Sequence, residues 1–432
     1  MYRSRQPERI RRALACALTL AVAPMLCASV ARAPSGYRAT GTIAISRWPY
    51  FPGSTFAVRV DGFSAPYHVA LLGEGTFRHD GTYEIAADAS PADTLLVAGN
   101  RSGLAARALR ITAPPSPRQA LLAVASYDDG IVFHDARTFS VLGILATGGA
   151  ASDDAFDATG RLAATDTQGN AVTFAALAPW RVSRFGSVPF GDEIAVDDPA
   201  RAIFITNRDV KGDGALTRVA SDGSIVTVVT GRTAEGLAVD VRRQLVYVAN
   251  VNDGTVAVVD ARSMRVLRRF AAVPRVFSLA LSADGRRLYA ISNQSAASPF
   301  AQPGAAVAFD LRRSPPRVVA RSRDLTFPIG EALDARDNTL FVTDEELDAV
   351  DVLDARTLLP KRPPLTTCRT PWKPTLDSAG RLFVPCARAD RIDAFDSRTL
   401  RRLPHAPFAT GSYPLAVAVW PGRRASNAPH RP

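Results

Sequence analysis

The chain has 432 residues, and 52 lysines and arginines against 41 aspartates and glutamates give it a formal net charge of +11. Only three of the basic residues are lysines, and the arginines are scattered without the basic run and interleaved aromatic residues that nucleic-acid binding requires. After residue 33 no stretch is long and apolar enough to span a bilayer, which excludes a protein with several membrane-spanning segments.

Residues 1–31 are predicted to be a secretory signal peptide. Met1 to Arg12 carries five arginines and one glutamate, and a short apolar run with small residues at its end follows from Ala13 to Val30. Cleavage after Ala31 would leave a mature chain with a net charge of about +7. We expect this chain to be soluble and either periplasmic or secreted. The alternative is an uncleaved anchor, but the run is interrupted and short for a membrane span.

Residues 37–113 are predicted to form a small immunoglobulin-like β-sandwich. The segments TFAVRVDGF, YHVALLG, TYEIAAD, DTLLVAGN and RALRITA are short, apolar or alternating, and separated by Gly, Pro and Asp turns. The sequence PPSPR at 114–118 is typical of a stiff linker.

An internal repeat occupies residues 119–422. Segments similar to YVAN, at 247–250, end at Ser126, Asp166, Asn207, Asn250, Ser292, Asp344 and Cys386, in steps of 40, 41, 43, 42, 52 and 42 residues. The one long step contains a Pro/Gly/Ser insertion at 295–304. A second apolar strand usually ends in Asp, as in DARTF, DARSM, DARTL and DSRTL, where the carboxylate can accept backbone N–H bonds of the turn.

Four short strands in each unit of about 42 residues predict a β-propeller. Seven units are present, the first without a leading strand, and a spare strand at 413–420 is expected to close the ring as the innermost strand of the first unit. Residues 423–432 have no apolar content to bury and are expected to be disordered. The sequence therefore predicts an all-β chain, with a seven-bladed propeller after the small sandwich.

The segment VYVANVNDGTVAVVD resembles the repeat of the YVTN-repeat, YncE-like family of exported seven-bladed propellers. The resemblance covers about Gln119 to Gly422 and weakens in the second and third units, where the strand-ending Asp is lost. It implies a propeller fold and export, but it supplies no common reaction.

Charged residues at the starts of the innermost strands are the candidate site. By alignment one rim gathers Asp153, Asp154, Asp192, Glu193, Glu235, Arg275, Glu331, Trp372 and Lys373. These residues suit an anionic or zwitterionic ligand, or a hard divalent cation such as calcium held by Glu193, Glu235 and Glu331. The alternative is a hydrated polar channel whose charges offset one another.

No catalytic residue is predicted, because no histidine falls on an innermost strand and no nucleophile elbow, phosphate loop or dinucleotide fingerprint is present. Two cysteines, Cys368 and Cys386, remain after removal of the signal peptide. The repeat places both at one rim, so a disulfide between them is predicted.

Two functions remain open. The first is an exported, monomeric, non-enzymatic propeller that needs no cofactor and recognises a protein, a glycan or a small ligand at the rim. The second is a divalent-cation-dependent hydrolase or lactonase, which requires at least three converging oxygen ligands.

Overall fold

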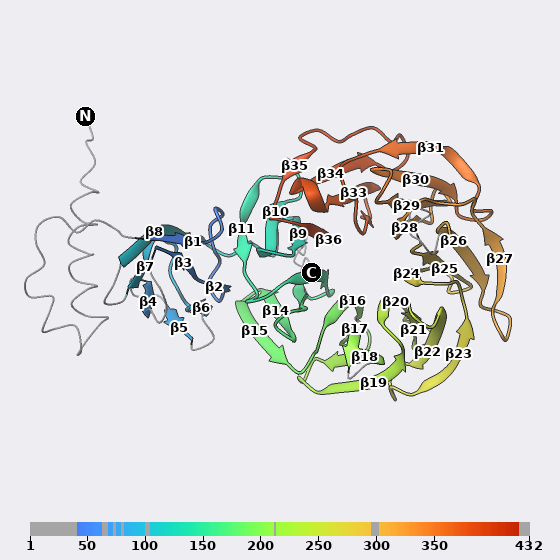
Figure 1. Ribbon diagram of the computed structural model, residues 1–432, viewed down its shortest axis with the longest axis horizontal. Helices are drawn as coiled ribbons and strands as arrows, with labels where there is room; N and C mark the ends of the chain where they lie inside the picture. The colour runs from blue at the N-terminus through green and yellow to red at the C-terminus, as the bar shows by residue number, and fades with distance from the viewer. Residues whose placement is uncertain are drawn as a thin grey trace, which may run out of the picture. The chain divides into compact units, whose positions relative to one another are not determined.

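Figure 1 shows the computed structural model, which describes residues 41–62, 68–71, 75–78, 82–99, 104–210, 213–294 and 302–422. The predicted signal peptide, the predicted tail and most of the insertion at 295–304 lie outside these residues. Within them the chain is nearly all β-strand, with one short 3₁₀ helix, η1, at Ala387–Ala389. The described part of the chain contains no helix long and apolar enough to cross a membrane. The all-β prediction is confirmed.

The chain divides after Ala113 into two compact units. The strands of the first unit are β1 (Thr42–Ala44), β2 (Thr55–Ala57), β3 (Arg59–Asp61), β4 (His68–Leu71), β5 (Gly75–Phe77), β6 (Thr82–Ile85), β7 (Ala92–Gly99) and β8 (Leu104–Ile111). They form the sheets β1-β3, β2-β6-β5 and β4-β7-β8. Tyr50, Phe51 and Tyr83 are almost fully buried in this unit. Its assignment as an immunoglobulin-like sandwich stays a prediction.

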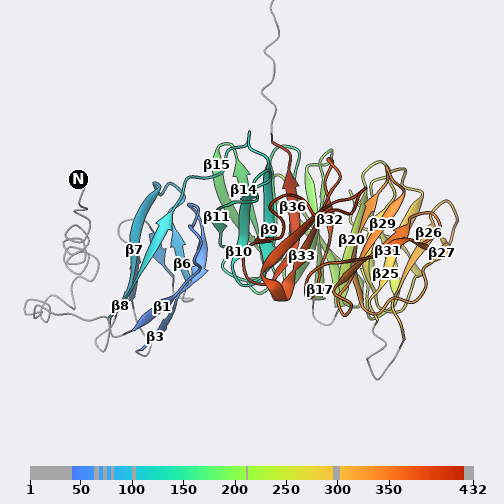
Figure 2. The ribbon, with the colours of Figure 1, turned by 90° about the horizontal axis from the view of Figure 1, so that it is seen from above.

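The second unit is a ring of four-stranded antiparallel sheets, the architecture of a β-propeller (Figures 1 and 2). Seven such sheets, here called blades 1 to 7, are present among the described residues. Blade 1 contains β9 (Leu121–Ser126), β10 (Gly130–Asp135), β11 (Val141–Leu145) and β36 (Pro414–Trp420). Blade 2 contains β12 (Ala151–Phe156), β13 (Arg161–Asp166), β14 (Ala171–Leu177) and β15 (Trp180–Gly186). Blade 3 contains β16 (Gly191–Asp197), β17 (Ala202–Val210), β18 (Asp213–Ala220) and β19 (Ile225–Gly231). Blade 4 contains β20 (Ala234–Asp240), β21 (Leu245–Asn250), β22 (Thr255–Asp260) and β23 (Val266–Ala271).

In blades 2 to 7 the strands follow chain order from the centre of the ring outward, whereas in blade 1 the innermost strand is β36. Blade 5 contains β24 (Val276–Leu281), β25 (Arg287–Ser292), β26 (Ala305–Asp310) and β27 (Arg317–Arg321). Blade 6 contains β28 (Pro328–Asp334), β29 (Thr339–Asp344), β30 (Ala349–Asp354) and β31 (Pro360–Thr366). Blade 7 contains β32 (Thr375–Leu376), β33 (Arg381–Cys386), β34 (Arg391–Asp396) and β35 (Phe408–Ala409). The last strand of the chain, β36, pairs with β9, so the two ends of the repeat region share one blade.

Apolar side chains fill the space between neighbouring blades. Tyr247, Val258 and Phe270 of blade 4 pack in one cluster with Leu288 and Phe309 of blade 5. The rings of Phe270 and Phe309 meet edge to face, with centroids 5.6 Å apart. Burial of each large apolar side chain contributes about 1.5–3 kcal/mol, so the contacts between blades hold the ring together.

The strand-ending aspartates act as turn residues, as the repeat predicts. Asp354 Oδ1 accepts hydrogen bonds from the backbone N–H groups of Arg356 and Thr357 at 2.9 Å, and from the Thr357 hydroxyl at 3.0 Å. Asp260 makes the same set of bonds in blade 4. Each carboxylate satisfies backbone donors that the turn would otherwise leave unpaired.

Two histidines of the ring lie away from the innermost strands. His134 is a buried strand residue with both ring nitrogens satisfied, Nδ1 by the Phe139 carbonyl oxygen at 3.0 Å and Nε2 by Thr410 Oγ1 at 2.9 Å. Burial lowers the pKa of His134 to about 4, so the ring is neutral at pH 7. His405 lies in the turn before β35, with a φ of 65°.

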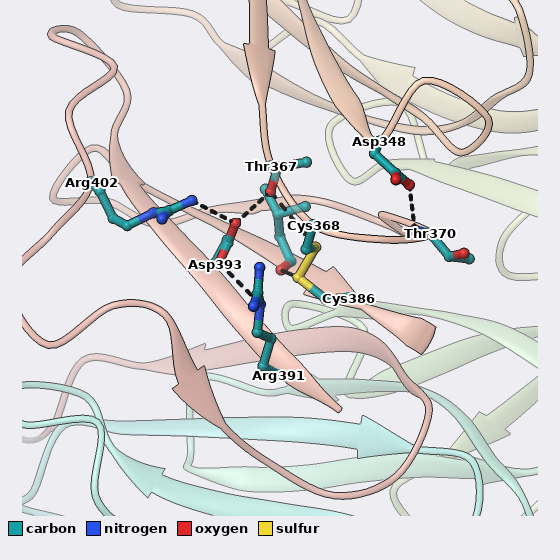
Figure 3. Close-up of a disulfide and its surroundings, with 9 residues drawn as sticks. Asp348, Thr367, Cys368, Thr370, Cys386, Arg391, Asp393 and Arg402 are labelled. Carbon is teal, nitrogen blue, oxygen red and sulfur yellow. Dashed lines mark hydrogen bonds and ion pairs between the residues drawn. A yellow bond between two sulfur atoms is a disulfide. The ribbon is translucent and has the colours of Figure 1, made fainter. Parts of the chain in front are cut away.

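Blade 7 differs from the others at its centre, because its innermost strand, β32, has only two residues. The predicted disulfide joins Cys368 to Cys386, with 5.6 Å between their Cα atoms (Figure 3). Pro371 bridges to Cys386, and the Trp372 N–H donates to the Pro385 carbonyl oxygen at 2.8 Å. The disulfide and these backbone contacts fix the irregular segment that carries Lys373.

Candidate functional site

Lys373 joins two other blades at the centre of the ring. Its ammonium group lies 3.0 Å from Asp153 Oδ2 of blade 2 and 2.9 Å from Glu193 Oε1 of blade 3. Each carboxylate also accepts a backbone N–H from the next blade, that of Ile194 for Asp153 and that of Leu237 for Glu193, both at 3.0 Å. The side chains are mostly buried, so this is a partly desolvated ion-pair network and not a surface salt bridge.

A second ion-pair group lies beside the first. Arg208, on the second strand of blade 3, places Nε 3.1 Å from Asp192 Oδ2 and 2.9 Å from Glu235 Oε1. Sequence reasoning missed Arg208 because it belongs to no innermost strand. The only signal was its position directly after the repeat residue Asn207.

Three carboxyl groups near these pairs have unpaired oxygens. Both oxygens of Asp154, both of Glu331 and Oε2 of Glu235 are buried and have no hydrogen-bond partner with good geometry among the described residues. The backbone of Ala418 lies near Asp154 and the Ser278 side chain lies near Glu331, and each favours the ionised form of its neighbour. The Glu235 carboxyl shares a hydrogen bond with the Asp192 carboxylate. An unsatisfied buried polar group costs about 1–3 kcal/mol, so a bound partner at these oxygens would be stabilising.

Burial changes the ionisation of these carboxyls. It raises the pKa of Glu331 to about 8, and the charge of Glu193 adds to the rise. Burial and the neighbouring Asp153 raise the pKa of Asp154 well above its usual range, and burial with Asp192 does the same for Glu235. Burial alone would lower the pKa of Lys373, but the surrounding carboxylates outweigh it and raise the pKa. Lys373 is therefore charged at pH 7, and Glu331 is largely a neutral acid.

The predicted site residues separate into those that meet and those that do not. The ones that meet, with Arg208, are here called the central cluster: Asp153, Asp154, Asp192, Glu193, Arg208, Glu235, Glu331 and Lys373. Arg275 turns away, since its Nε donates to the Asn293 carbonyl oxygen at 2.9 Å. The described residues show no hydrogen bond, ion pair or ring contact between the Trp372 side chain and the cluster.

The acids predicted as metal ligands are not gathered into one group among the described residues. Among the described residues, the one group of three potential ligands with their donor atoms within 4.8 Å of one another is Cys368, Cys386 and Asp393, whose two sulfurs are bonded to each other (Figure 3). Glu193, Glu235 and Glu331 do not form such a group in the part of the chain that the structure describes. A lysine ammonium lies instead between Asp153 and Glu193.

Comparison with known proteins identifies the fold. No protein-family model matches the chain, and no curated protein matches it significantly. Solved structures do match. The periplasmic gluconolactonase PpgL of Pseudomonas aeruginosa has a TM-score of 0.57 and 15% identity, over 69% of this chain and 98% of that protein. A putative 6-phosphogluconolactonase of Bacteroides fragilis has a TM-score of 0.57 and 12% identity, over 70% and 98%.

Hydrazine synthase of Kuenenia stuttgartiensis is similar at a TM-score of 0.58 and 13% identity, over 66% of this chain and 94% of that one. At such identities the likeness establishes the architecture alone. The class of protein is therefore a β-propeller, and membership of the YncE-like family stays a prediction.

Proposed function

We propose that the mature chain is an exported, non-enzymatic β-propeller that binds a polar ligand or a partner's polar group at the rim of the central cluster. The observation that carries this proposal is the set of buried carboxyl oxygens on Asp154 and Glu331 that make no hydrogen bond of good geometry with the described residues. A ligand with hydrogen-bond donors would satisfy them.

Export rests on the predicted signal peptide and on the disulfide, which is the form that an oxidising compartment favours. The structural similarity to a protein described as a periplasmic gluconolactonase agrees with this location.

A cation-dependent lactonase is the second candidate, and the two lactonase-like structures among the similar proteins favour it. Against it, Lys373 forms ion pairs with Asp153 and Glu193, two of the acids of the central cluster. A metal at this position would have to displace or tolerate the ammonium group.

Ligand-induced thermal stabilisation tests the binding proposal. A panel of sugars, polyols, amino acids and amines is screened against the mature protein, Glu331→Met and the exposed control Asp128→Asn. We expect at least one compound to raise the melting temperature of the parent and of Asp128→Asn but not of Glu331→Met.

Hydrolysis of glucono-δ-lactone is measured on the same three proteins, with and without EDTA. Lactone hydrolysis that EDTA abolishes and calcium restores, and that Glu331→Met lacks, would move the lactonase ahead of the binding protein.

A further inference from the structure

Exposed apolar side chains gather on the outer strands of the propeller. Among the described residues, six of the eight large hydrophobic side chains that are exposed lie on, or directly before, the outermost strands of blades 3 to 6. They are Val226 and Val229 by β19, Leu267 by β23, Val318 and Val319 by β27, and Leu359 before β31. Leu267 is 57% exposed and Val318 is 54% exposed.

The same strands of blades 4 and 5 are strongly basic. Residues 262–271, RSMRVLRRFA, contain four arginines, and residues 311–323, LRRSPPRVVARSR, contain five. Neither segment contains an aspartate or a glutamate. Arg265, Arg317 and Arg321 are exposed and make no ion pair with any residue that the structure describes. Their charge is therefore available to a partner.

Folding places the two segments next to each other. Figure 1 shows β23 and β27 as the outer strands of neighbouring sheets, and Arg268 Nη1 donates to Ser314 Oγ at 3.1 Å across the boundary between the blades. The two arginine-rich segments thus lie side by side on the outside of the ring. This basic outer surface is defined by Arg265, Leu267, Arg317, Val318 and Arg321.

We infer that the basic outer surface docks the propeller on an anionic lipid surface. Exposed arginines without ion pairs on adjacent blades attract an anionic partner, and they disfavour a second copy of this chain because like charges would face each other. The exposed leucine and valine side chains beside the arginines favour a lipid surface over a fully hydrated acidic polymer, because only the lipid surface offers an apolar phase. At a lipid surface they can enter the interface while the guanidinium groups reach the headgroup phosphates.

Vesicle cosedimentation tests the inference with the mature protein. The probes are phosphatidylcholine vesicles with and without phosphatidylglycerol, at low and physiological salt. We expect binding to the anionic vesicles only, and weaker binding at the higher salt, because screening shortens the reach of the arginines.

Two variants and one matched control separate the contributions of the arginines and of the apolar side chains to vesicle binding. Arg265→Gln/Arg317→Gln/Arg321→Gln should weaken binding by at least about tenfold. The control Arg181→Gln/Arg398→Gln/Arg401→Gln removes three exposed arginines from blades 2 and 7 and should change it by less than about twofold. Leu267→Ser/Val318→Ser should weaken vesicle binding by about threefold or more. The binding that remains should depend more strongly on salt, because it would rest on the arginines alone. Unchanged melting temperatures establish that each variant is folded.

Three outcomes overturn the inference. The first is absence of binding to phosphatidylglycerol vesicles. The second is an equal loss in the control and in the blade 4 and 5 arginine variant, which means that net charge alone governs binding. The third is full binding by Leu267→Ser/Val318→Ser together with displacement by dextran sulfate, which identifies a polyanion site with no use for a lipid interface.

Discussion

Carboxylates occupy two contrasting regions of this propeller, the outer turns and the centre of the ring. In the turns, Asp260 and Asp396 accept bonds from backbone N–H groups and neighbouring hydroxyls, and these bonds hold the pKa of each below its usual value. At the centre, burial raises the pKa of Glu331 to about 8, and its oxygens make no hydrogen bond of good geometry with the residues that the structure describes. The repeat thus uses acidic side chains as structural turn residues outside and leaves unsatisfied ones inside, where binding can satisfy them.

The largest effect should come from removing the ammonium group at the centre. Lys373→Met leaves Asp153 and Glu193 without their cation, and breaking a buried pair costs about 3–5 kcal/mol. The matched control is Lys361→Met, whose ion pair with the more exposed Asp337 contributes less than about 1 kcal/mol. Lys361 also donates to the Asp337 carbonyl oxygen and the Thr339 hydroxyl, but its total loss should stay below that of Lys373→Met because the Lys361 and Asp337 side chains remain partly accessible to water. Urea unfolding at pH 7 measures both. Equal losses would contradict the contrast between centre and periphery.

Removing the disulfide should have the next largest effect. Cys368 and Cys386 are 18 residues apart, and closing a loop of that size stabilises a fold by about 3 kcal/mol. Because the bridge also fixes the segment that carries Lys373, Cys368→Ala/Cys386→Ala combined with Lys373→Met should cost less than the two changes measured separately. Strict additivity in urea unfolding would show that the bridge does not position Lys373.

The neutral acid at the centre predicts a pH dependence. The pKa of Glu331 is about 8 in the folded chain, above its ordinary 4.5, so the folded state holds the proton more tightly. Its contribution to stability is fully present below about pH 4.5 and is lost as the pH rises through about 8. Glu331→Gln cannot ionise, so it should be more stable than the parent at pH 8.5 by about 1–3 kcal/mol and closer to it at pH 5. An equal difference at both pH values, measured by urea unfolding, would contradict this assignment.

The smallest effect should come from the turns. Asp354→Ala removes four hydrogen bonds at the end of β30, three from the following turn and one from the Asn338 side chain, but water can replace them at this exposed position, so we expect a cost of about 1 kcal/mol. A loss as large as that of Lys373→Met, by the same unfolding measurement, would remove the distinction between the two regions.

The repeat predicted the blades and their turn aspartates because strand length, turn chemistry and period are local properties of the chain. It also predicted that Asp154, Glu193, Glu235, Glu331 and Lys373 lie at one rim. The repeat could not predict the contacts between these side chains, because Lys373 and Asp153 are 220 residues apart in the sequence.

Two further details of the site depend on geometry that no repeat pattern encodes. Arg208 reaches the cluster from a second strand, and Arg275, with a φ of 51°, turns toward Asn293. The positions of the strands follow from periodicity, whereas the direction of a long charged side chain follows from its neighbours in other blades.

Thermal unfolding of the mature protein and of Lys373→Met, each in EDTA and after addition of calcium, magnesium, manganese or zinc, tests the central claim most directly. If the lysine ammonium is the cation of the central cluster, the melting temperature of the parent should be indifferent to every metal. Lys373→Met should then be stabilised by a divalent cation that the freed carboxylates can bind. A metal-dependent rise in the parent that disappears in Glu235→Gln and Glu331→Gln would contradict the claim and establish a metal site in its place.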